Sequence, residues 1–154
     1  MMEAEKPVSL CTLRTGGDVF GIETGAVREA LLQCELREAP LAPGFVAGVL
    51  AYRGEVLVAV SFRALMGLPA RAEASSAVVL QDGESGEMFA LLMDELVDVA
   101  QVDARSWEAN PALLEARQRL IFNGAYRMDG VPVVRLETER VQPSWLMRSA
   151  EVWR

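Results

Sequence analysis

A chain of 154 residues with 51% apolar and 24% charged residues has the composition of a folded globular protein, which excludes intrinsic disorder. Its 22 acidic and 15 basic residues give a net charge of −7, which opposes the approach of a phosphate backbone and argues against nucleic-acid binding. No apolar run reaches the roughly 18 residues of a membrane-spanning helix, and the N-terminus lacks an apolar signal segment. We therefore expect a cytoplasmic protein without direct membrane insertion.

The inventory of reactive side chains argues against catalysis. The chain has no histidine, which removes Ser/His and Cys/His pairs and most zinc sites. Cys11 and Cys34 do not form a CxxC pair and lie among apolar neighbours, so we expect reduced core thiols. Asp94, Glu95 and Asp98 form an acidic cluster that a solvated turn explains. We therefore expect no enzyme activity, no cofactor and no metal site.

The first half of the chain predicts short strands joined by turns. The strand-like runs are residues 10–14, 19–22, 48–52 and 56–60. Thr15 to Asp18 contains two glycines and predicts a hairpin turn between the first two runs. Residues 27–34 place apolar side chains on one helical face, but residues 31–36 also alternate as a strand does, so both readings stay open.

The stretch GVLAYRGEVLVAV, residues 48–60, is apolar almost throughout and is interrupted at its centre by Arg53 and Gly54. A glycine at this point supplies the positive φ that a tight hairpin turn requires. We therefore place Arg53 at the tip of a hairpin, where its guanidinium reaches solvent or a partner.

The second half predicts further hairpins. Residues 61–67 predict one helical turn, and the alanine-rich segment 69–76 is the best candidate for an internal boundary. More strand-like runs lie at residues 77–81, 88–93, 97–102, 121–127 and 131–136. Residues 110–118 predict either a short helix or a loop, and residues 138–147 predict a C-terminal helix. This spacing indicates a mainly β protein of two small barrels, with approximate subdomains 15–72 and 77–140.

Four segments stand out when they are taken in chain order: VFGIETGAVREAL at 19–31, PLAPGFVAGVLAYRGEVLVAVSFRALMG at 40–67, FALLMDELVDVAQV at 89–102 and GVPVVRLETERV at 130–141. Together they resemble the CheW family of chemotaxis coupling proteins. The most specific part combines P-x-A-P-x-F-V-x-G-V and R-G with the later L-x-x-D-E-L-x-D-V. The resemblance covers roughly residues 8 to 147, so we expect one CheW-like domain over residues 1–154.

The resemblance implies two intertwined five-stranded SH3-like β-barrels with short helices, a C-terminal helix and a groove between the barrels, with termini that cross between them. It implies a non-enzymatic adaptor that couples the cytoplasmic hairpin tip of a chemoreceptor to the regulatory domain of a CheA-type histidine kinase. It also implies recruitment to receptor clusters. A ligand-binding or enzymatic barrel is a weaker alternative, because the residues offer no catalytic set.

The resemblance also implies site residues. The positions that match the receptor-binding groove are Val27, Glu29, Gly48, Arg53 and Gly54, with Arg53 held by Glu29. The positions that match a kinase-binding surface are Trp107, Glu108 and Leu113.

The chain departs from the family pattern at both surfaces. Ala51-Tyr52 stands where Asn-Leu is usual, and Ser61 stands where an aspartate is usual. Glu108 replaces a basic residue, and Leu113 replaces a phenylalanine. An alternative therefore stays open, a divergent CheW-like scaffold that binds a receptor or another partner without joining kinase arrays.

Overall fold

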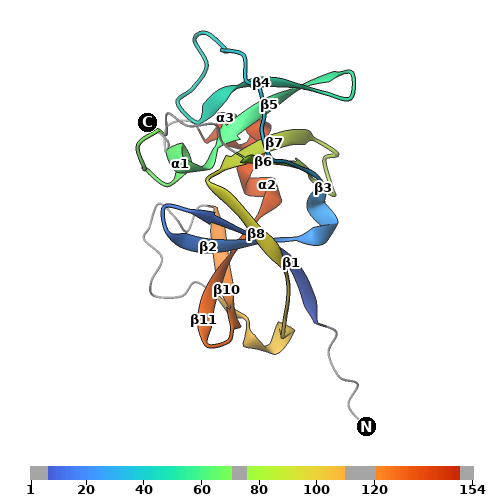
Figure 1. Cartoon of the computed structure of the whole chain (residues 1–154), viewed down its shortest axis with the longest axis vertical. Helices are drawn as coiled ribbons and strands as arrows, with labels where there is room; N and C mark the ends of the chain where they lie inside the picture. Colours follow the sequence, from blue (N-terminus) through green and yellow to red (C-terminus); the bar gives the residue numbers. More distant parts are fainter. Residues whose placement is uncertain (1–6, 71–75, 110–120, 150–154) are drawn as a thin grey trace.

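A computed structural model describes residues 7–70, 76–109 and 121–149 of the chain. Strands dominate these residues and form two sheets that lie one above the other along the long axis of the molecule (Figure 1). The longest helix in these ranges has six residues, so none of the described helices could span a bilayer.

One sheet has six strands in the order β8-β1-β2-β11-β10-β9. Its members are β1 (Val8–Thr15), β2 (Asp18–Glu23), β8 (Glu95–Val102), β9 (Glu108–Ala109), β10 (Phe122–Met128) and β11 (Val131–Leu136). The pairing of β2 with β11 is parallel, and the other pairs are antiparallel. The N-terminal hairpin thus lies between β8 and the hairpin of β10 and β11. The sheet exceeds the expected five strands because β9 adds two residues to its edge.

The other sheet has five strands in the order β3-β6-β7-β5-β4. Its members are β3 (Val27–Leu31), β4 (Val46–Tyr52), β5 (Glu55–Ser61), β6 (Ser76–Gln81) and β7 (Met88–Met93). Since β5 pairs in parallel with β7, the expected boundary near residue 72 falls within the span of this sheet, so the sheets do not follow the expected subdomains 15–72 and 77–140. The chain passes between the sheets at η1 (Thr24–Ala26) and again at Asp94.

Two segments differ from the single helix that their sequence patterns allow or predict. Residues 27–31 form a strand, β3, because pairing with β6 satisfies their backbone groups. The expected helix over 138–147 is instead two short helices, α2 (Thr138–Val141) and α3 (Pro143–Arg148). Gln142 between them has φ −70° and ψ 143°, the extended conformation that a following proline favours.

Three phenylalanines form the centre of the core that joins the sheets. Phe20 comes from β2, Phe122 from β10 and Phe62 from α1 (Phe62–Leu65). The Phe20 ring lies 4.8 Å from Phe62 in an edge-to-face arrangement and 5.3 Å from Phe122 in a stacked one. We call the cluster around them the shared core; its other buried members are Leu13, Ile22, Phe45, Val60, Leu65, Val78, Leu80, Phe89, Leu91, Met93, Ile121, Ala125, Val134, Leu136, Val141 and Leu146.

Strands β6 and β7 are buried on both faces. Val78 and Leu80 of β6 point into the shared core, whereas Ala77 and Val79 point into a second cluster inside the five-stranded sheet. Such double burial explains why these runs are continuously apolar in the sequence.

The shared core predicts the effect of Phe62→Ala. Truncation of this fully buried ring should lower the free energy of unfolding by about 3–5 kcal/mol, because the side-chain contacts are lost and a cavity remains. Urea unfolding followed by circular dichroism measures the change. Leu32→Ala, at a side chain that is 75% exposed, should cost less than about 0.5 kcal/mol. Similar losses in both variants would contradict the core assignment.

Candidate functional site

The β4–β5 hairpin ends in the turn that the sequence predicts. Arg53 has φ 47° and Gly54 has φ 81°, and positive values at both central residues define a type I′ turn. Tyr52 and Glu55 are the paired residues that flank this turn. The hairpin extends away from the rest of the molecule at the top of Figure 1. Arg53 therefore lies at a projecting tip, and its side chain is 74% exposed.

Glu29 of β3 holds the Arg53 guanidinium. Glu29 Oε1 accepts a hydrogen bond from Arg53 Nη2 at 2.6 Å and another from Tyr52 Oη at 3.3 Å. The hydrogen bond to Glu29 is the main reason that the pKa of Arg53 is raised. Because β3 and β4 are opposite edges of the five-stranded sheet, these contacts bridge the two edges where the sheet curls toward a barrel.

Gly48 and Val27 have supporting positions. A Cβ atom on Gly48 would lie 2.4 Å from the Arg37 carbonyl oxygen, so only glycine permits this approach. Arg37 and Val49 exchange backbone hydrogen bonds of 2.8 and 2.9 Å, which fixes the 32–45 segment against β4. Val27 is partly buried and packs against the shared core. Both residues position the hairpin and β3 without presenting polar groups to a partner.

The β4–β5 hairpin is apolar on both faces. Leu50 and Leu57 point into the second core cluster. The cross-strand pairs Val49–Val58 and Ala51–Val56 lie on the other face, which we call the outer hairpin face. Val56 is 73% exposed there, and a hollow of about 610 Å³ beside it is lined by Val49, Ala51, Val56 and residues of the 31–37 segment. An apolar face that the described residues leave partly exposed is typical of a protein interaction site.

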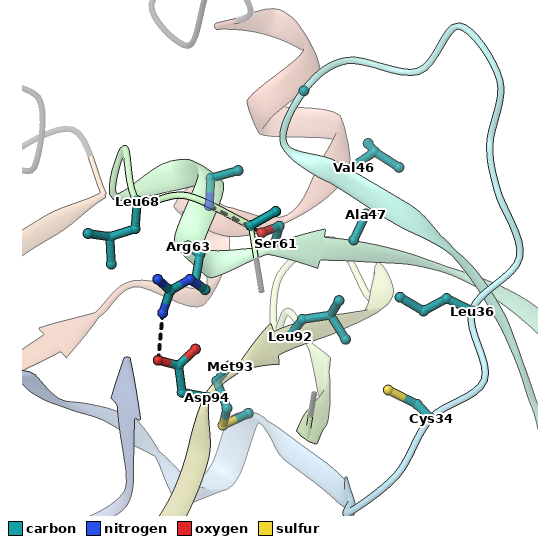
Figure 2. Close-up of a pocket in the computed structure, with 13 residues that line it drawn as sticks. Cys34, Leu36, Val46, Ala47, Ser61, Arg63, Leu68, Leu92, Met93 and Asp94 are labelled. Carbon is teal, nitrogen blue, oxygen red and sulfur yellow. Dashed lines mark hydrogen bonds and ion pairs between the residues drawn. The ribbon is translucent and has the colours of Figure 1, made fainter. Parts of the chain in front are cut away.

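A second hollow, of about 460 Å³, lies beside α1 and the β7–β8 junction (Figure 2). Arg63 Nη1 contacts Asp94 Oδ2 at 2.7 Å, and the two side chains are only 20% and 15% exposed. The same oxygen accepts a hydrogen bond from the Gly16 backbone N–H at 3.0 Å. The expectation that Asp94 lies in a solvated turn is therefore wrong, since this carboxylate ties the β1–β2 turn to α1.

Ser61, which stands where the family pattern usually has an aspartate, is a local hydrogen-bond acceptor. Its Oγ accepts a hydrogen bond from the Ala64 N–H at 3.1 Å and so caps α1 (Figure 2). With this cap in place, Arg63 pairs with Asp94 and Arg53 pairs with Glu29.

Trp107, one of the expected kinase-binding residues, packs onto the six-stranded sheet. Its ring lies 4.9 Å from the Tyr126 ring, and the Arg135 guanidinium lies over it at 5.2 Å. A Cβ atom on Gly124 would lie 2.3 Å from the Trp107 ring, so the close packing of this indole requires a glycine. The Trp107 side chain therefore packs mainly against other residues of this chain.

Glu108 lies next to Trp107 on β9 and is exposed. Its Oε2 is 3.9 Å from Arg127 Nη2, a long and solvated ion pair. Leu113 lies outside the described residues. The β4–β5 tip and the segment that carries Trp107 lie toward opposite ends of the long axis (Figure 1), so Arg53 is well separated from Trp107 and Glu108.

Among the described residues, no group of three His, Cys, Asp or Glu side chains could hold a metal ion. Cys11 is a buried thiol and Cys34 a partly buried one, and burial raises the pKa of each.

The sequence analysis did not include Tyr52 in the Arg53 site. An aromatic residue directly before Arg-Gly was the signal that could have indicated it.

Two small barrels joined by one core, with an ion-paired arginine on a projecting turn, define a protein-interaction domain. Residues 9–143 match the family model of the CheW-like domain, and the chain belongs to this family. Its role is accordingly that of a CheW-like scaffold or adaptor.

Comparison with individual proteins agrees with this assignment. The chain is 28% identical over 135 residues to "Chemotaxis protein CheW" of Rhizobium meliloti (strain 1021), with 88% of this chain and 87% of the relative covered. It is also 34% identical over 100 residues to "Chemotaxis protein CheA" of Salmonella typhimurium (strain LT2), a match that covers 64% of this chain but 15% of that protein.

A solved structure confirms the fold. The scaffolding protein TtCheW from Thermoanaerobacter tengcongensis superposes with a TM-score of 0.76 at 17% sequence identity, covering 85% of this chain and 89% of that one. The mainly β fold with SH3-like barrels, expected from the sequence, is thereby confirmed.

The Gly48 contact predicts a position-specific cost. Gly48→Ala should lower the free energy of unfolding by about 2 kcal/mol or more, because the new Cβ displaces the Arg37 carbonyl. Gly25→Ala is the matched control, since a Cβ atom there meets nothing within 4 Å. Urea unfolding of both variants tests this, and a Gly48→Ala protein as stable as Gly25→Ala would refute the close approach.

Proposed function

We propose that the chain couples the cytoplasmic hairpin tip of a chemoreceptor to the regulatory domain of a CheA-type histidine kinase. The observation that carries the proposal is the Arg53 guanidinium, presented on a projecting turn by Glu29 and bordered by the outer hairpin face, on which Val56 is exposed. In this proposal the protein works in the cytoplasm and is recruited to receptor clusters.

The receptor side of the proposal follows from complementary chemistry. A helical hairpin presents apolar side chains at helical spacing, and these would cover Ala51 and Val56. Arg53 is a planar donor that pairs with carboxylates or carbonyl groups at fixed geometry. Apolar burial would then supply most of the affinity, and Arg53 would supply orientation. Val27 and Gly48 support this surface from beneath.

The kinase side of the proposal rests on the β9 region. Glu108 is exposed at the edge of the six-stranded sheet, where a partner could reach it directly. Trp107 would act by holding β9 in place through Tyr126 and Arg135. We include Leu113 in the proposed kinase surface because its position matches the family pattern.

A second candidate is a CheW-like scaffold that binds a receptor or another partner without joining kinase arrays. The inward packing of Trp107 favours it, because this indole offers little free surface for a second protein. The two candidates differ in a single property, which is whether the wild-type chain binds a kinase regulatory domain.

Charge reversal at the hairpin tip tests the receptor side. Arg53→Glu should weaken binding to a purified chemoreceptor cytoplasmic fragment at least about 10-fold, because two carboxylates then face each other at the tip. Arg53→Ala should weaken it about 3-fold. Isothermal titration calorimetry measures both. Arg105→Glu, at another exposed and ion-paired arginine, should bind as wild type. Unchanged affinity in both Arg53 variants would discard the proposed site.

Charge reversal on β9 tests the kinase side. Glu108→Arg should weaken binding to the regulatory domain of the cognate kinase at least about 5-fold, because a partner that faces Glu108 would carry the complementary charge. Binding to the receptor fragment should not change, since the two surfaces lie on different sheets. If the wild-type chain binds the receptor fragment but no kinase domain, the second candidate is correct.

A further inference from the structure

Tyr52 is the last residue of β4 and directly precedes the Arg53-Gly54 turn. Its side chain is partly buried and packs against the second core cluster, which contains Leu50 and Leu57. A ring held by core packing loses little further freedom when it makes an additional contact. Tyr52 is therefore a rigid group immediately next to a long, exposed arginine.

Tyr52 contacts both members of the ion pair. Its hydroxyl donates a hydrogen bond to Glu29 Oε1 at 3.3 Å, the same oxygen that accepts from Arg53 Nη2. Its ring lies beneath the Arg53 guanidinium, with 5.5 Å between the guanidinium carbon and the ring centroid, which is within the range of a cation–π contact. Each of the three side chains thus touches the other two.

An ion pair as exposed as Arg53–Glu29 has little tendency to stay in one arrangement by itself. Water screens the attraction, and the arginine must give up several rotatable bonds to hold one geometry. The Tyr52 ring adds a cation–π contact with the guanidinium, and the Tyr52 hydroxyl adds a hydrogen bond to the carboxylate. Both additions are anchored in the core of the five-stranded sheet.

We propose that Tyr52 is a positioning residue that holds Glu29 and Arg53 in one arrangement before a partner arrives. The consequence is a lower entropy cost of binding, since the guanidinium is already ordered. This inference rests on the proposed function of Arg53 in partner recognition, and it adds the residue that gives the exposed cation a fixed direction.

Two substitutions at Tyr52 separate its two contacts. Tyr52→Phe removes the hydroxyl and keeps the ring, whereas Tyr52→Leu removes both contacts and leaves an apolar side chain for the core. Tyr126→Phe is the matched control, because Tyr126 is the only other tyrosine and packs on Trp107 in the six-stranded sheet. If Tyr52→Leu fails to fold, Tyr52→Met takes its place beside Tyr52→Phe in every comparison.

The first measurement needs no partner. Side-chain ¹⁵N relaxation of the Arg53 Nε–Hε group reports the order of the guanidinium in the free protein. The order should fall in Tyr52→Phe, fall further in Tyr52→Leu or Tyr52→Met, and stay at the wild-type level in Tyr126→Phe. An Arg53 side chain equally ordered in wild type and in the variants that lack the ring would overturn the inference.

The second measurement is binding to the purified chemoreceptor cytoplasmic fragment. We expect the dissociation constant to rise about 2-fold in Tyr52→Phe and about 5-fold in Tyr52→Leu, because the Arg53 side chain must then be ordered during binding. If Arg53→Glu weakens binding while Tyr52→Leu loosens Arg53 without any effect on affinity, pre-ordering by Tyr52 is refuted and the proposed function stands. If Arg53→Glu itself has no effect, the proposed receptor site fails, and the inference fails with it.

Discussion

The shared core is the constraint on which the rest of the structure depends. Phe20, Phe62 and Phe122 come from three elements, two of them strands of the six-stranded sheet, and Phe89 and Leu91 enter the same cluster from the five-stranded sheet. Full burial of such a side chain contributes about 1.5–3 kcal/mol. Neither sheet could separate from the other without exposing these side chains, so the two ends of the molecule are fixed relative to one another.

The β4–β5 hairpin shows a compromise between stability and recognition. Its inner face, with Leu50 and Leu57, fills the second core cluster, and its outer face leaves Val56 in water. The type I′ turn places Arg53 at a positive φ, which costs a non-glycine residue free energy. A hairpin optimised for stability alone would have a polar outer face and glycine or asparagine at that turn position. The departures from this optimum lie together at one tip, which is where a binding role would place them.

Short-range chemistry made parts of this structure predictable. The pair Arg53-Gly54 specified a tight turn, and the run of apolar residues on either side specified two strands. Pairing between distant segments was not predictable in this way. The parallel pairing of β5 with β7 depends on residues about 30 positions apart, so a polar, alanine-rich segment between them resembled a domain boundary.

The candidate site was predictable to a similar degree. The resemblance to a known family indicated Glu29 and Arg53, and their ion pair is present. It could not indicate that Gly48 is required by the Arg37 carbonyl or that Asp94 is enclosed with Arg63, because both contacts arise only after distant segments pack. Tyr52 was visible only as a departure from the family pattern, and its contacts with both charged neighbours give that departure a physical meaning.

One core between two separate surfaces also limits how such a domain could transmit a signal. Closely packed interiors shift as units and deform little, so a partner bound at the β4–β5 tip would change the position of β9 chiefly by moving the whole body. Asp94 strengthens this rigidity, since it joins the β1–β2 turn to α1 at the point where the chain crosses between the sheets. If both surfaces bind as proposed, the chain would relay the placement of a receptor to a kinase through its own fixed geometry, and no internal conformational switch would be required.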